Sequence, residues 1–274
     1  MMETKARVVG LKQVSRQKGS PLFTLIEFVG KVSLFGMRVI IDGLRPPFEA
    51  AQILRQTAEV GSKSLPLVIA AGFALGTVMT LHTRSTLVTF GAAAMIPTVQ
   101  ALAFFVEIGP LVAGLLMAGR VGSGIGAVLA NMRATEQIDG IESLSIDSFK
   151  FLVVPRVVAA VVALPLLTLF MDFAGLAGGF LSEFASSKIS FALYIRRAFE
   201  NLQWANFIAP TVKTAVFGFI IGTVSAYFGY TTNRGSEGVG HAATSSVVVS
   251  SLLIILADVF LVKCIFFVFP ETAL

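Results

Sequence analysis

Ionisable side chains inside long apolar stretches are the residues in this sequence whose types and positions could do chemistry. They are Glu107, Asp172, Lys213, Asp258 and Lys263. A charge at the centre of a membrane helix costs about 2.5–3.5 kcal/mol on insertion scales, so such residues usually face the interior of a bundle and find partners there. These positions therefore indicate either a passage for ions or substrate, or ion pairs that fix the register of helices.

Two of these positions allow a more specific interpretation. Lys213 and Asp258 carry opposite charges, and a pair between them could be purely structural or could serve transport. Glu107 is followed by Ile108-Gly109-Pro110, and Pro110 cannot donate a backbone hydrogen bond, which predicts a kink beside the carboxylate. Broken helices expose polar groups to a cavity in transporters. A water-facing carboxylate in an external vestibule is the alternative for Glu107.

Enzymatic chemistry finds no support in the sequence. There is no phosphate loop of the G-x-x-x-x-G-K-[ST] type, no H-E-x-x-H and no G-x-S-x-G. The single cysteine, Cys264, and the widely separated His82 and His241 offer no metal framework. We expect no catalytic residue, metal or cofactor in this chain. If ATP drives the protein, a separate subunit must bind it.

The elements that position these residues are expected to be membrane helices. The chain is 55% hydrophobic and 14% charged, with a mean hydropathy of +0.83, whereas soluble domains are about 45–50% apolar and about 25% charged. A spanning helix needs about 20 apolar residues. We therefore predict an all-α integral membrane protein with an external loop or short surface helix at 83–96 and five transmembrane helices at about 64–81, 97–119, 157–181, 207–231 and 247–269.

Residues 22–44 differ from the predicted spans because their charges recur on one side of an otherwise apolar helix. Those charges are spaced by 4, 7 and 4 residues and form two i,i+4 pairs of opposite sign: Glu27, Lys31, Arg38 and Asp42. This pattern predicts an N-terminal amphipathic helix in the membrane interface, ended by Pro46-Pro47. A helix packed on a partner protein is the alternative. We divide the chain into a cytoplasmic N-terminus with interfacial helices, 1–63, and a five-span domain, 64–274.

The distribution of lysine and arginine predicts the topology. With the N-terminus in the cytoplasm, fifteen of these residues fall on the cytoplasmic side and four outside, which satisfies the positive-inside rule. The basic residues before the first apolar stretch suit an anionic cytoplasmic leaflet rather than nucleic acid: Lys5, Arg7, Lys12, Arg16 and Lys18. Two glycine pairs, Gly72/Gly76 and Gly218/Gly222, permit close approach of helices but say little about a dimer face.

One stretch carries a family resemblance. It reads Glu107-Ile-Gly-Pro-Leu-Val-Ala-Gly-Leu-Leu-Met-Ala-Gly-Arg120-Val-Gly-Ser-Gly, followed by Asn131-Met-Arg-Ala-Thr-Glu136-Gln-Ile-Asp139. This closely resembles the MlaE/YrbE permease family, the membrane subunits of MCE-associated ABC transporters, and the likeness covers about residues 60–265. The resemblance implies a homodimeric ABC transporter permease of the cell inner membrane, multi-pass, which moves phospholipid or a related lipid between the inner membrane and the outer envelope.

The resemblance also implies partners and sites. The expected partners are a second copy of the chain, a cytoplasmic ABC ATPase that binds the ATP, an MCE-domain protein on the periplasmic side and the lipid substrate. A coupling helix that docks on the ATPase is implied at Ala127 to Glu142, and its charged residues are Arg133, Glu136 and Asp139. A lipid cavity is implied around the outer part of the first two spans, at Met79, Leu87, Phe90 and Glu107.

Two other classes of function stay open at this stage. An ion-coupled secondary transporter could use the intramembrane carboxylates Glu107, Asp172 or Asp258 as proton carriers. A membrane scaffold without cargo is the other alternative. Co-purification of an ATPase separates the first alternative from the permease, and lipid bound in the cavity separates the second.

Overall fold

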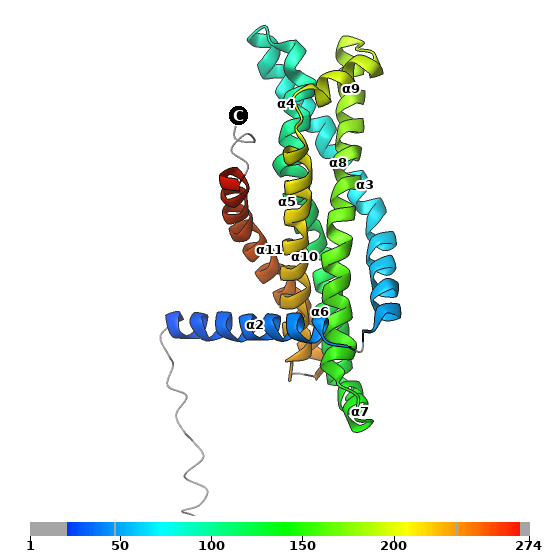
Figure 1. The fold of residues 1–274 in the computed structure, drawn as a ribbon, viewed down its shortest axis with the longest axis vertical. Coiled ribbons are helices and arrows are strands. Elements are labelled where there is room, and N and C mark those ends of the chain that lie inside the picture. The colour runs from blue at the N-terminus through cyan, green and yellow to red at the C-terminus, as the bar shows by residue number, and fades with distance from the viewer. Residues whose placement is uncertain (1–20, 47, 234, 269–274) are drawn as a thin grey trace, which may run out of the picture.

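Five long apolar helical runs form a bundle in the computed structural model, which describes residues 21–46, 48–233 and 235–268 (Figure 1). The described residues contain no strand, so the prediction of an all-α membrane protein with five spans is confirmed. The basic residues predicted to act before position 20 lie outside the described residues. The five runs are Ala50–Thr89, Ala93–Ala134, Phe149–Ser187, Trp204–Tyr230 and Gly235–Phe267.

The first run, α3 (Ala50–Thr89), is longer than the sequence indicated. Its 40 residues correspond to about 60 Å at 1.5 Å per residue, twice the hydrocarbon thickness. The prediction of a loop or short surface helix from residue 83 was wrong, because polar side chains do not end a helix and hydropathy detects only the part in lipid. The helix ends where Gly91 takes φ +71°. The Gly91 N–H donates to the Val88 oxygen (3.0 Å) and the Ala92 N–H to the Leu87 oxygen (2.8 Å), a Schellman ending.

The second run contains two turns of π-helix. Pro110 lacks the N–H that would continue the ladder, and the chain widens just before it, where the Gly109 N–H donates to the oxygen of Phe104. A π-turn also comes just before Pro155: η4 (Phe149–Val153) leads directly into the helix that contains this proline. The predicted kink beside Glu107 thus takes the form of a π-turn. The segments of the run are η1 (Ala93–Met95), α4 (Ile96–Ala103), η2 (Phe104–Ile108), α5 (Gly109–Met117), η3 (Ala118–Gly122) and α6 (Ser123–Ala134).

The third long helix, α8 (Val154–Ser187), packs against both α3 and α10 (Trp204–Tyr230). Both glycine pairs noted in the sequence face α8. A Cβ added at Gly72 of α3 would lie 2.5 Å from the backbone oxygen of Met171, and one added at Gly218 of α10 would lie 2.5 Å from that of Ala160. These glycines therefore serve packing within the chain, because a larger residue would push the helices apart.

The two ends of the bundle carry shorter helices. α2 (Pro21–Leu44) lies across one end of the bundle, near α7 (Gln137–Ser143), and α9 (Phe191–Glu200) lies at the opposite end (Figure 1). Both ion pairs predicted along α2 are present, Lys31–Glu27 at 2.6 Å and Arg38–Asp42 at 3.2 Å. The crosswise position of α2 and its exposed apolar side chains fit the predicted interfacial helix. The last span is α11 (Gly235–Val268).

Candidate functional site

Three ionisable residues from three spans meet inside the bundle, and we refer to them as the ion cluster: Glu107, Lys213 and Asp258. The Nζ of Lys213 on α10 lies 2.9 Å from the Oε2 of Glu107 in η2 and 2.9 Å from the Oδ1 of Asp258 on α11. The pair between Lys213 and Asp258 that the sequence suggested is therefore present. The contact with Glu107, 106 residues away along the chain, was not anticipated from the sequence.

Burial is uneven within the ion cluster. The side chains of Lys213 and Asp258 are 2% and 6% exposed, whereas that of Glu107 is 39% exposed. The structure buries Lys213 between two carboxylates. The balance of charges within the spans could have predicted the ion cluster. One lysine cannot neutralise two carboxylates, so the second carboxylate needs access to a polar environment. Glu107 is the member of the cluster through which a polar group could reach it.

Electrostatic attraction between the lysine and the two carboxylates stabilises the ion cluster. The ammonium of Lys213 lies between two carboxylates, and a buried ion pair is tolerated only when its charges are mutually compensated. Loss of Lys213 would leave Asp258 buried without a cation. The π-turn at η2 and Pro110 give Glu107 its position, because the wider turn rotates the residues before Gly109 relative to those after it.

Asp172, the other predicted intramembrane acid, does not join the ion cluster. It is 0% exposed on α8, and neither carboxylate oxygen has a hydrogen-bond partner among the described residues. Its Oδ1 lies against Gly109, at a place where a Cβ on that glycine would collide with it. Asp172 therefore lies in the contact between α8 and the π-turn that carries Glu107. Lys263, at the far end of α11, is exposed.

The residues implied to line a lipid cavity are dispersed on the single chain. Met79 is half-buried against the hydrophobic core, Leu87 is half-buried, and Phe90 is 77% exposed at the end of α3. Three cavities, of about 350, 350 and 300 Å³, are lined by other side chains. A shared site for Met79, Leu87, Phe90 and Glu107 would need a second surface besides this chain.

The segment implied to couple with an ATPase is broken into two helices. We expected one helix from Ala127 to Glu142, but α6 continues the second span to Ala134 and α7 begins at Gln137. Glu136 lies at the break with φ +58°, a left-handed conformation that disrupts a helix of L-residues. Across the break, the Nη1 of Arg133 lies 2.7 Å from the Oδ1 of Asp139.

Buried and polar contacts attach α7 to the bundle. Ile138 is fully buried, and the Ser148 hydroxyl donates to the Oε1 of Glu142 at 2.6 Å and lies 2.8 Å from the hydroxyl of Tyr230 at the end of α10. The loop is also tied to α2, since the Nη2 of Arg38 lies 3.6 Å from the Oδ1 of Asp147. A displacement of α7 would therefore be transmitted through these contacts to α10 and α2.

At the opposite end of the bundle, polar contacts join the outer helices. The hydroxyl of Tyr194 on α9 donates to the Oε1 of Gln100 on α4 at 3.0 Å. Burial, and to a smaller extent the nearby charge of Glu183, raise the pKa of Tyr194 above its ordinary value, so the hydroxyl stays a donor. No group of three or more His, Cys, Asp or Glu side chains in the described part of the chain could hold a metal ion.

Comparisons with known proteins match nearly the whole membrane domain. The family model described as Permease MlaE matches residues 53–264. A probable ABC transporter permease of Rickettsia bellii is 38% identical over 257 residues, which cover 94% of this chain and 99% of the relative. A probable ABC transporter permease of Synechocystis sp. is 35% identical over 238 residues, covering 86% and 90%. The chloroplastic protein TRIGALACTOSYLDIACYLGLYCEROL 1 of Arabidopsis thaliana is 33% identical over 236 residues, covering 86% of this chain and 67% of that protein.

Proposed function

The chain belongs to the MlaE family of ABC transporter permeases, and from that premise we propose that it moves phospholipid or a related lipid between the inner membrane and the outer envelope. The observation that carries the proposal is the family match over residues 53–264. The name of the Arabidopsis relative, which contains that of a glycerolipid, supports a lipid as the cargo.

The transported lipid is proposed to occupy a cavity shared by two copies of the chain. α3 and α11 keep large apolar side chains exposed, among them Phe73, Val78, Leu252 and Phe260, and such surfaces suit acyl chains or a second apolar protein surface. In this arrangement Met79, Leu87 and Phe90 contact acyl chains. Glu107, the exposed member of the ion cluster, faces the headgroup.

The energy source is proposed to be ATP hydrolysed by a separate cytoplasmic ATPase. The chain contains no phosphate loop. α7, with Arg133, Glu136 and Asp139 around its start, is the proposed docking element, because it protrudes beyond the spans at the end of the bundle where α2 lies (Figure 1). An MCE-domain protein is proposed as the periplasmic partner. The excess of lysine and arginine on the α2 and α7 side supports a cytoplasmic N-terminus in an inner membrane.

Reconstitution tests the proposal. The chain is co-expressed with the ATPase and MCE genes of its own genome, purified, and placed in liposomes with a fluorescent phospholipid. ATP is expected to drive transfer of that lipid to or from the MCE protein, and an ATPase variant without hydrolysis provides the control. A complex that hydrolyses ATP but moves none of a panel of phospholipids and glycolipids would refute the proposal.

A second candidate function is favoured by one observation, the ion cluster itself. The ion cluster places two carboxylates on one lysine within the bundle, and carboxylates inside membrane bundles serve as proton relays in pumps and transporters. In that case the chain alone would work on a proton gradient, without an ATPase. Gradient-driven uptake by liposomes that contain only this chain would favour this candidate over the permease.

A further inference from the structure

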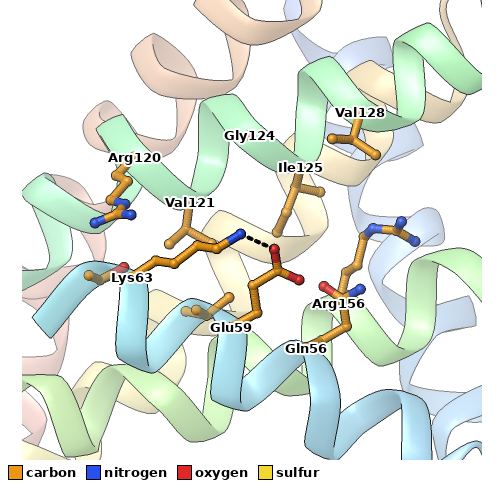
Figure 2. Close-up of a pocket in the computed structure, with 11 residues that line it drawn as sticks. Gln56, Glu59, Lys63, Arg120, Val121, Gly124, Ile125, Val128 and Arg156 are labelled. Carbon is orange, nitrogen blue, oxygen red and sulfur yellow. Dashed lines mark hydrogen bonds and ion pairs between the residues drawn. The ribbon is translucent and has the colours of Figure 1, made fainter.

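A charged cavity lies away from the ion cluster. It is formed by the first parts of α3 and α8 and by the second span. Its volume is about 350 Å³, within the ~300–1,000 Å³ typical of small-ligand sites. Three cations and one acid line it: Lys63, Arg120, Arg156 and Glu59. Figure 2 shows Arg120 and Arg156 on opposite sides of the cavity, with the Lys63–Glu59 pair between them.

The three cations flank predicted spans at their ends on one side of the membrane. Lys63 immediately precedes the first predicted span, Arg120 immediately follows the second, and Arg156 immediately precedes the third. Three separate helices thus bring a positive charge to the plane where hydrocarbon gives way to headgroups. With the topology proposed above, this plane is the cytoplasmic one.

The donors of this cavity are only partly used within the chain. The Nη1 of Arg156 donates to the oxygen of Leu152 at 2.5 Å, which leaves the rest of its guanidinium to face the cavity. Arg120 has no ion-pair or hydrogen-bonding side-chain partner among the described residues. Ser64, which also lines the cavity, is 1% exposed and its hydroxyl has no partner in the described part of the chain. A buried hydroxyl without a partner, in a cavity lined by two guanidinium groups with unused N–H donors, fits a ligand that brings acceptor oxygens.

The remaining wall is apolar. Val60 of α3 and Val121, Ile125 and Val128 of the second span complete the lining, and Val128 is 47% exposed. A soluble anion would gain nothing from this wall, whereas an acyl chain would. Basic pockets between membrane helices on the cytoplasmic side are typical sites for anionic lipid headgroups.

We infer that this cavity binds an anionic glycerophospholipid of the cytoplasmic leaflet. Its phosphate accepts hydrogen bonds from cationic side chains of the lining and from the hydroxyl of Ser64, while Lys63 stays paired with Glu59. One acyl chain lies against the apolar wall formed by Val60, Val121, Ile125 and Val128. The site is separate from the dimer cavity and the ion cluster of the proposed function. The inference takes only the side of the membrane from that proposal.

A site-specific reporter can test this inference. Trp204 is the single tryptophan of the chain, so Trp204→Phe combined with Val128→Trp confines the emission to the cavity wall. The full chain is placed in nanodiscs of phosphatidylcholine that contain equal fractions of either brominated phosphatidylglycerol or brominated phosphatidylcholine. The brominated phosphatidylglycerol is expected to quench as though enriched at least about fivefold, the effect of roughly one cation near a membrane surface.

Matched variants test whether the cations of the cavity cause the enrichment of phosphatidylglycerol. Arg156→Gln is expected to lower the enrichment about fivefold, and Arg156→Lys to retain most of it. Arg55→Gln, on an exposed cation of the same helix α3 that does not line the cavity, is expected to leave it unchanged. Monodisperse elution of each variant excludes misfolding as the cause.

Two outcomes would overturn the inference. Equal quenching by the two brominated lipids would show that the cavity does not select an anionic headgroup. Loss of the preference on addition of millimolar inorganic phosphate at constant ionic strength would identify a site for a small free anion. Because the readout needs neither ATPase nor transport, a failure of the proposed function does not alter it.

Discussion

Removal of Lys213 is the perturbation for which the structure predicts the largest and most specific effect. Lys213→Met keeps the length of the side chain but leaves Asp258, 6% exposed, without its cation. Removing one partner of a buried pair costs about 3–5 kcal/mol, because the remaining charge stays desolvated. Asp258→Leu should cost less, since Lys213 then keeps Glu107, whose Oε2 lies 2.9 Å from its Nζ.

The double variant Lys213→Met/Asp258→Leu is expected to cost no more than either single variant, because no fully buried charge then lacks a partner. The coupling energy would accordingly be about 3 kcal/mol. Calorimetric unfolding of the purified protein in detergent provides the measurement. Lys263→Met, which removes an exposed charge from the same helix α11, is the control and should stay within about 0.5 kcal/mol of the unmodified protein.

The result that would refute this reasoning is additivity. If the double variant lost the sum of the two single losses, Lys213 and Asp258 would not interact in the folded protein. A loss caused by Lys263→Met as large as that caused by Lys213→Met would also count against it. The effect would then follow from removal of any charge in a span rather than from the pair.

Three further predictions concern other parts of the chain. Glu136→Lys should weaken association with the ATPase in pull-down experiments while the permease elutes as before, and unchanged association would argue against α7 as the docking element. Gly218→Leu should cost about 1–3 kcal/mol in thermal unfolding through overpacking against α8, whereas Gly119→Leu, where nothing lies within 4 Å, should cost little. Arg84→Met should cost about 3 kcal/mol because Glu183, its partner at 2.6 Å, is 4% exposed; an unchanged unfolding temperature would show that this pair is not stabilising.

The sequence by itself determined the spans, the interfacial helix and the family. Each depends on local information. A helix in lipid must satisfy its backbone hydrogen bonds internally, so about 20 apolar residues predict a span whatever surrounds them. Charges spaced by 4 and 7 residues likewise predict one face of α2 without knowledge of its neighbours. The lengths of α3 and of the second run were missed, since hydropathy measures the thickness of the bilayer and not the extent of the helix.

Only the tertiary structure decided which faces meet. Glu107 joins Lys213 across 106 residues, and Lys63, Arg120 and Arg156 surround one cavity although each precedes or follows a different span. Asp172, which the sequence grouped with the other intramembrane acids, remains apart and without a partner among the described residues. The physical reason is that all faces of these helices are apolar. Their rotation and neighbours are therefore set by close packing at small residues such as Gly72 and by the need to pair buried charges, and both depend on the whole bundle.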